Sequence, residues 1–142
     1  MARISDSIDS TPVRTLLIKS FIDAHDRPIK TIAVALRDAG IEVILADYEV
    51  PEDIVDIAEE EDVDVIGVSF LSGGQVEVTR KLMQVLRERK LDDIPVLVGG
   101  TIRPFDIPAL KEAGVSSIFR GGEPLASIAE SIRALAAIRR SS

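Results

Sequence analysis

Residues 63–69, which read VDVIGVS, and residues 94–100, which read IPVLVGG, decide the fold class. Both runs are short, rich in β-branched residues and apolar at consecutive positions, which is typical of strands covered by helices on both faces. Working outward from these two strands (64–69 and 95–99), we expect further strands at 13–19, 42–46 and 116–119. Amphipathic helical segments separate them: Ile29, Ile32, Ala33 and Leu36 recur at helical spacing before Gly40, and similar patterns cover about 52–61, 75–89, 105–113 and 125–139.

Strand and helix thus alternate five times with short connections, a pattern that predicts right-handed crossovers and a parallel sheet. The fold class is therefore α/β: a flavodoxin-like (Rossmann-like) doubly wound five-stranded parallel sheet with strand order 2-1-3-4-5. Residues 1–12 are expected to form a flexible N-terminal arm, and 13–142 a single domain. Open sheets of this kind bind ligands beyond the carboxyl ends of their strands, so the segments after the strands are the candidate functional regions.

Composition narrows the function classes. The 142-residue chain has a formal net charge of −7, which argues against nucleic acid as a partner. It has no cysteine, which excludes disulfides, thiolate metal sites and a cysteine nucleophile. No apolar run approaches the ~18 residues of a membrane span, and the first residues lack an apolar signal core. These features predict a soluble, cytoplasmic protein without a membrane or nucleic-acid partner.

The segment after the first strand contains the only histidine of the chain, in the string KSFIDAHDRP at 19–28. Asp23 and His25 are two residues apart, so on extended backbone both side chains point to the same side. The carboxylate can then accept a hydrogen bond from one imidazole nitrogen and leave the other free to bind a metal. One imidazole cannot hold a free metal ion, so any metal bound by His25 would arrive already held by another group, such as a tetrapyrrole-like ring. The alternative is an ordinary surface histidine beside a carboxylate.

Small residues follow the later strands. Ser69 ends the third strand, where its hydroxyl can point into the crevice; the alternative is a turn in which Ser72 caps the third helix. Gly99 and Gly100 end the fourth strand, and Gly121 and Gly122 follow the fifth. Paired glycines let a ligand lie against backbone, although each pair is also compatible with a tight turn. Together they suggest a flat, glycine-lined rim for a large, elongated ligand.

Several other functions lack their motifs. No Walker loop or dinucleotide-binding glycine pattern follows the first strand, and there is no nucleophile elbow. A phospho-acceptor receiver domain shares this fold, but it needs an acidic pair after the first strand and an aspartate ending the third. Those places hold Ser20-Phe21 and Ser69.

In this order, Asp23-x-His25, Ser69-x-Leu71 and Gly99-Gly100 resemble the three-part signature of cobalamin-binding domains, most of all the domain of methylmalonyl-CoA mutase and related acyl-CoA mutases. The similarity runs from about residue 13 to residue 138. The resemblance implies that His25 is the lower axial ligand of cobalt, replacing the cofactor's own dimethylbenzimidazole.

The same resemblance implies roles for the remaining residues. Asp23 would orient His25, and Lys19 matches a lysine that supports this network. Ser69 would hydrogen-bond the displaced nucleotide tail. Leu71, Gly99 and Gly100 would line the tail's pocket, and Gly121 and Gly122 complete the set of candidate cofactor-binding residues.

Two positions depart from the family pattern. Pro28 stands where the family has glycine, which predicts a stiffer loop after His25. The segment Arg120-Gly121-Gly122-Glu123 stands where the family favours Gly-Pro-Gly-Thr. A contact through the threonine hydroxyl is therefore lost, and Arg120 is a candidate to meet a phosphate instead.

Methyltransferase-type corrinoid proteins usually carry a helical bundle before this domain, whereas only about a dozen residues precede the first strand here. The resemblance therefore implies the small subunit of an adenosylcobalamin-dependent acyl-CoA mutase, an isomerase, that docks on a separate large subunit which binds the acyl-CoA. The chain alone should show no turnover. The alternatives are a non-catalytic cobalamin carrier or sensor-type module, and, more remotely, an interaction module that has lost its ligand.

Overall fold

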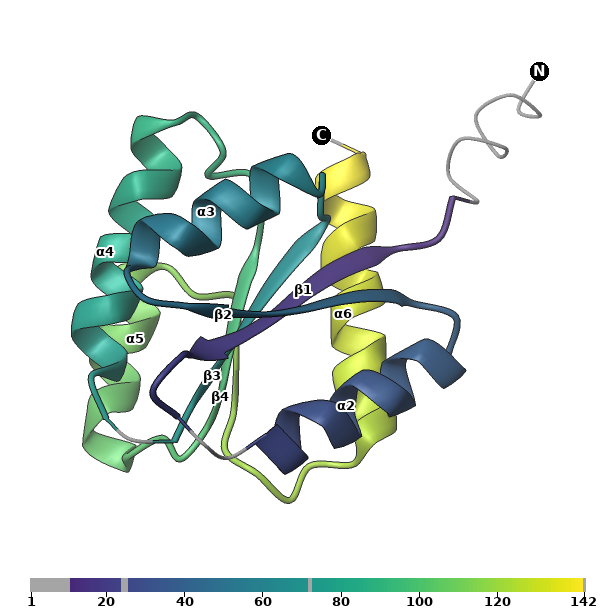
Figure 1. Cartoon of the computed structure of the whole chain (residues 1–142), viewed down its shortest axis with the longest axis horizontal. Helices are drawn as coiled ribbons and strands as arrows, with labels where there is room; N and C mark the ends of the chain where they lie inside the picture. The colour runs from purple at the N-terminus through teal and green to yellow at the C-terminus, as the bar shows by residue number, and fades with distance from the viewer. Residues whose placement is uncertain (1–10, 24–25, 72, 142) are drawn as a thin grey trace.

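The computed structural model describes residues 11–23, 26–71 and 73–141. Within them lies one five-stranded parallel sheet of order β2-β1-β3-β4-β5 (Figure 1), which confirms the predicted order. In chain order the elements are β1 (Arg14–Ser20), α2 (Asp26–Asp38), β2 (Glu42–Tyr48), α3 (Pro51–Glu60), β3 (Val65–Phe70), α4 (Gln75–Glu88), β4 (Val96–Gly100), η1 (Pro104–Asp106), α5 (Ile107–Ala113), β5 (Ser117–Phe119) and α6 (Leu125–Arg140).

Helices cover both faces of the sheet. The helices α3, α4 and α5 pack against one another on one face, and α2 and α6 pack together on the other (Figure 1). The first face carries the larger core, which includes Leu16, Ile66 and Leu82. The second core is smaller and includes Leu36 and Ile132. Since β1 and β3 are buried over nearly all their length, their continuous apolar sequences are explained by this double cover.

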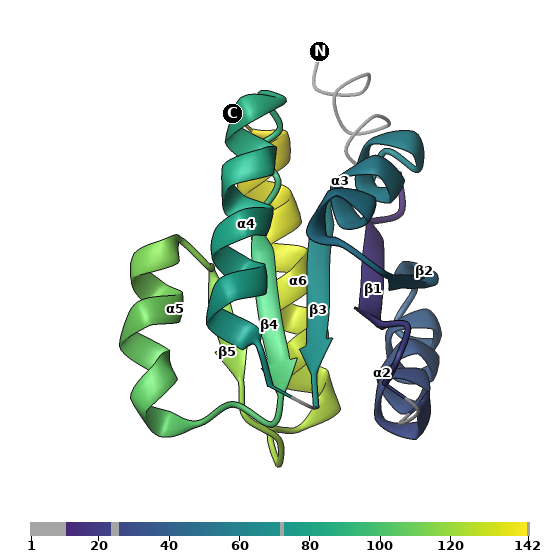
Figure 2. The same cartoon turned by 60° about the vertical axis from the view of Figure 1, so that its left-hand side comes forward.

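The sheet register brings the ends of the strands together. Lys19 on β1 pairs with Ser69 on β3, which pairs with Gly99 on β4, which pairs with Phe119 on β5. In the turned view the arrowheads of β1, β3 and β4 point to the same edge (Figure 2). The segments that follow the strands therefore meet there, as the sequence predicted.

One predicted helix is divided. The segment expected as a single helix at 105–113 begins as the short 3₁₀ turn η1 and becomes α-helical only at Ile107. Pro108 explains this boundary, because proline fits the first turn of an α-helix, where its missing N–H is not needed, and disrupts the interior.

The amino edge of the sheet is held by charged residues. The buried Asp64 carboxylate accepts hydrogen bonds from the Arg14 amide (3.0 Å) and from the Arg140 guanidinium (3.1 and 2.8 Å). Arg140 also donates to the carbonyls of Thr11 and Pro12. Residues 1–10 of the expected arm lie outside the described residues. In the part of the chain that the structure describes, none of the helices is long and apolar enough to cross a membrane.

Candidate functional site

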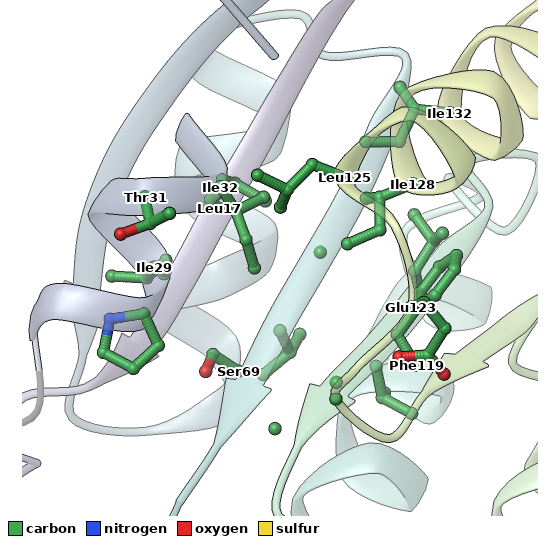
Figure 3. Close-up of a pocket in the computed structure, with 18 of the residues that line it drawn as sticks. Leu17, Ile29, Thr31, Ile32, Ser69, Phe119, Glu123, Leu125, Ile128 and Ile132 are labelled. Atoms are coloured by element: carbon green, nitrogen blue, oxygen red, sulfur yellow. The ribbon is translucent and has the colours of Figure 1, made fainter. Parts of the chain in front are cut away.

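A pocket of about 400 Å³ lies between the sheet and the helices α2 and α6 (Figure 3). It extends from the middle of β1, β3 and β4 to their carboxyl ends, and then to the segment between β5 and α6. Ile29 and Ile32 of α2 line one side, and Ile128 and Ile132 of α6 line the other. Among the described lining residues, the polar side chains are those of Thr31, Ser69 and Glu123. The pocket is therefore largely apolar, with polar groups at a few places.

Missing side chains on one face of the sheet create the pocket. Alternate residues of a strand share a face, so Leu17, Gly67 and Leu97 all point toward α2 and α6, and Gly99 follows Leu97 on that face. A Cβ atom added at Gly67 would lie 2.9 Å from Cδ2 of Leu17. One added at Gly99 would lie 3.3 Å from the carbonyl oxygen of Phe119. Glycine at both positions therefore lets Leu17 and the Phe119 carbonyl lie close to the sheet backbone at the floor of the pocket.

At position 100 the backbone conformation itself requires glycine. Its φ is +101°, and a Cβ atom there would collide with the carbonyl oxygen of Phe70. That same carbonyl accepts a hydrogen bond from the amide of Thr101 (2.7 Å), so the backbones of β3 and β4 approach closely at their ends. The structure thus requires glycine at 100 for the chain to turn, in addition to its place in the pocket lining.

The segment after β5 forms part of the lining through Gly121, Gly122 and Glu123. Both glycines have positive φ values, +93° and +84°. The turn brings the Glu123 carboxylate back to accept a hydrogen bond from the Arg120 amide (2.9 Å). This bond lowers the pKa of the Glu123 carboxyl, and the amides of Glu123 and Gly121 and the Arg120 guanidinium lower it further, against a smaller opposing effect of burial.

The segment after β1 is anchored by a buried lysine. The Lys19 ammonium donates to the Asp23 carbonyl (2.6 Å) and forms an ion pair with Asp47 (3.3 Å). The Asp23 amide donates to the Ser20 carbonyl (3.1 Å), and Asp23 is itself buried. Burial raises the pKa of Tyr48, and the nearby Asp23 carboxylate raises it further. These contacts fix the backbone that leads into His25.

His25, the predicted cobalt ligand, lies outside the described residues together with Ala24. Its role therefore stays a prediction from the sequence. Over the described ranges, no group of three or more histidine, cysteine, aspartate or glutamate residues is arranged to hold a metal ion.

The structure brings most of the predicted site residues to one place. Ser69, Gly99, Gly100, Gly121 and Gly122 all line the pocket. A smaller depression beside it contains Lys19, and Ile29 lines both cavities. Leu71 is partly buried and is not among the residues that line the pocket. The N-cap residue of α4 is Gly74, in a left-handed conformation and without a side-chain cap; Ser72 lies outside the described residues.

Sequence reasoning missed the apolar walls of the pocket, namely Leu17, Gly67, Leu97, Phe119, Ile128 and Ile132. Most of these positions read as ordinary core. One signal was available: Gly67 interrupts the third strand on the same face as Gly99, since the two positions are in equivalent phase along paired strands.

Comparison with known proteins places the chain in a family. Residues 13–135 match the family model described as the B12 binding domain. The chain therefore belongs to the B12-binding domain family, and the resemblance inferred from its motifs is confirmed.

The chain is also similar in sequence to individual proteins of this family. The chain is 44% identical to the 2-hydroxyisobutanoyl-CoA mutase small subunit of Aquincola tertiaricarbonis, over 93% of this chain and 98% of that protein. It is 40% identical to the pivalyl-CoA mutase small subunit of Xanthobacter autotrophicus, over 87% and 84%. The methylmalonyl-CoA mutase of Escherichia coli is 39% identical over 79% of this chain, which corresponds to only 16% of that enzyme.

Solved structures confirm the fold. A cobalamin-binding protein from Desulfitobacterium hafniense superposes with a TM-score of 0.72 at 17% identity, covering 88% of this chain and 60% of that one. The receiver domain of the putative response regulator NarL from Mycobacterium tuberculosis superposes with a TM-score of 0.68 at 15% identity, over 89% and 97%. These likenesses concern the fold alone, and the strand ends of this chain carry Ser20 and Ser69 where a receiver needs acidic groups.

Proposed function

We propose that this chain is the cobalamin-binding small subunit of an adenosylcobalamin-dependent acyl-CoA mutase, with the substrate-binding barrel on a separate large subunit. The observation that carries the proposal is the glycine-floored apolar pocket at the carboxyl edge of the sheet, beside the anchored segment that leads into His25. The near full-length match to a mutase small subunit supports it. A cytoplasmic location is part of the same proposal.

The shape and lining of the pocket fit the nucleotide tail of cobalamin. A planar, largely apolar base needs a flat slot, and the pocket offers an apolar floor in which Gly67 and Gly99 carry no side chain. Ser69 at the end of β3 is one of the few polar side chains in the lining, so its hydroxyl is available to bond a polar group of the tail. Gly99 and Gly100 let the tail lie against backbone.

The segment after β1 would present the cobalt ligand. Lys19, paired with Asp47, holds the Asp23 carbonyl, so the backbone two residues before His25 has a fixed position. Asp23 would accept a hydrogen bond from one nitrogen of His25 and leave the other nitrogen to bind cobalt. Leu71, just past β3, would approach the cofactor from the neighbouring strand end.

Bound adenosylcobalamin would supply the radical chemistry of the carbon-skeleton rearrangement. The residues of this chain bind and orient the cofactor and exclude water from its tail. The acyl-CoA would be bound by the large subunit, so the small subunit should have no turnover by itself.

The first experiment is a titration of the purified chain with adenosylcobalamin, followed by visible absorbance. We expect spectra of a form in which histidine has displaced the benzimidazole, and we expect His25→Ala to lose that form. Free imidazole added to the variant should restore part of it, which separates a missing ligand from a damaged pocket. Acidification should also disfavour the histidine-bound form, because ligation needs the neutral imidazole. Absence of cobalamin binding by the wild-type chain would refute the cofactor assignment.

The second experiment distinguishes a mutase subunit from a carrier or sensor. The loaded chain is mixed with a mutase large subunit and assayed for isomerisation of 2-hydroxyisobutanoyl-CoA and pivalyl-CoA, the esters named for its relatives. Turnover that requires both subunits would support the proposal. Tight cobalamin binding without association with a large subunit would favour a carrier.

A further inference from the structure

We propose that Glu123 is a specificity-determining residue of the pocket: its carboxylate, held by the Arg120 amide beside the lining, weakens the binding of ligands that bring an anionic group there. The proposal rests on the proposed function, because the ligand considered is cobalamin. The nucleotide tail of cobalamin carries one phosphodiester, whereas cobinamide lacks the nucleotide and its phosphate.

The Glu123 carboxylate is held by the backbone of its own turn. Oε2 accepts a hydrogen bond from the Arg120 amide at 2.9 Å, and the amides of Gly121 and Glu123 also stabilise the charged form. Gly121 and Gly122, both at positive φ, lie between Arg120 and Glu123 in the turn that brings the carboxylate back to the Arg120 amide. Convergent amides of this kind are a common way in which proteins bind anions. Here the bound anion is a side chain of the same turn.

The position of this carboxylate matters because of its surroundings. Glu123 lines the pocket together with Gly121, Gly122 and Phe119 (Figure 3). Among the described lining residues it is the only one with a charged side chain. The other described lining side chains are apolar or, at Thr31 and Ser69, uncharged, so no cation of the described lining offsets its charge within the cavity. The Arg120 guanidinium contributes to lowering the carboxyl pKa, but Arg120 does not belong to the lining.

A ligand phosphate that approaches this end of the pocket therefore meets two obstacles. It is repelled by a fixed negative charge, and the Arg120 amide, which could bind it, already donates to Glu123. Either the phosphate remains away from the turn or the carboxylate must leave its amides. Both cost binding free energy, and a neutral side chain of the same shape removes the part of that cost that is due to repulsion.

The test compares two ligands and three proteins. Dissociation constants of adenosylcobalamin and adenosylcobinamide are measured at low ionic strength by absorbance titration for wild type, Glu123→Gln and Glu112→Gln. Glutamine has nearly the same shape and keeps an oxygen that can accept from the Arg120 amide. Glu112 lies exposed on α5, across the sheet from the pocket, and its substitution changes the net charge by the same amount. Melting temperatures show that each variant is folded.

We expect Glu123→Gln to bind adenosylcobalamin about five- to tenfold more tightly than wild type, with adenosylcobinamide unchanged and Glu112→Gln like wild type. Unchanged or weaker cobalamin binding by Glu123→Gln would overturn the inference while leaving the cofactor assignment intact. An equal gain for cobinamide, or for Glu112→Gln, would overturn it in favour of a general charge effect. If no protein binds cobalamin, the proposed function fails, and this inference fails with it.

Discussion

Replacing Asp64 with asparagine exchanges one side-chain oxygen for nitrogen, and we expect this small change to destabilise the chain strongly. Asp64 accepts two hydrogen bonds from Arg140 and one from the Arg14 amide, and Arg139 lies 3.5 Å away. Removing one partner of a fully buried ion pair costs about 3–5 kcal/mol. The side chains of Arg139 and Arg140 remain 20% and 23% exposed, so water can compensate in part. We therefore expect a loss of about 2–3 kcal/mol of unfolding free energy.

The assay is thermal and urea denaturation followed by circular dichroism. For a chain of this length the loss corresponds to a decrease in melting temperature of about 5–10 °C. Asp93→Asn is the matched control, because Asp93 also bonds Arg139 (3.1 Å) but its side chain is 56% exposed. Exposed pairs contribute about 0–1 kcal/mol, so the control should remain close to wild type. Equal effects of the two substitutions would contradict the reasoning.

The pH dependence provides an independent check. Burial raises the pKa of the Asp64 carboxyl, but the hydrogen bonds from Arg140 and the Arg14 amide, with the charges of Arg140 and Arg139, outweigh it and leave the pKa below its usual value. A carboxyl with a lowered pKa contributes its full stability above the pKa of the unfolded chain, about 3.9, and loses it as the pH falls through the folded value. The difference between wild type and Asp64→Asn should therefore shrink below about pH 4. A difference that persists at pH 2.5 would show that charge is not its cause.

Three further predictions concern the pocket and its surroundings. Gly100→Ala should lose about 2–4 kcal/mol of unfolding free energy in urea denaturation, because φ is positive there and the added Cβ atom would collide with the Phe70 carbonyl. Gly40→Ala is the control: φ is also positive there, but no atom lies near the added Cβ, so this variant should lose less. Gly99→Leu should leave the chain folded but raise the dissociation constant for cobalamin at least about tenfold, since the side chain fills the pocket floor; unchanged affinity would show that the tail does not lie there. Lys19→Met should release the Asp23 carbonyl and weaken the binding of His25 to cobalt. Visible spectra of the cobalamin-loaded variant should then show a smaller histidine-bound fraction than the wild type. A fraction equal to that of the wild type would show that this anchor is not needed.

Much of the fold could be predicted because the chain gives repeated, consistent signals. The apolar run of β3 is typical of a strand covered on both faces. Its alternation with helical segments then predicts a parallel sheet. The strand ends were also close to their observed positions, since Ser69 and Gly99 lie at or next to the last residue of β3 and β4. Because the carboxyl ends of parallel strands lie at one edge of the sheet, the positions of Ser69 and the glycines near those ends were enough to predict that these residues lie together.

Other features could not be read from the sequence because they depend on contacts between distant segments. The ion pair of Lys19 with Asp47 exists only because β1 and β2 lie side by side in a particular register. Likewise, Ile128 of α6 reads as part of an amphipathic helix, and only the packing of α6 beside α2 shows that it faces a cavity. The return of the Glu123 carboxylate to the Arg120 amide depends on the conformation of two glycines, which composition does not specify.

The cavity between α2 and α6 also has a thermodynamic consequence. On that side of the sheet a cavity lies between the sheet and two helices, so packing there contributes less stability than a filled interior would. Any molecule that fits the cavity in the native state but not in the unfolded chain adds stability in proportion to the logarithm of its concentration. A cofactor bound in this cavity, as proposed above, would therefore slow proteolysis of the chain and slow amide exchange in α2 and α6 most.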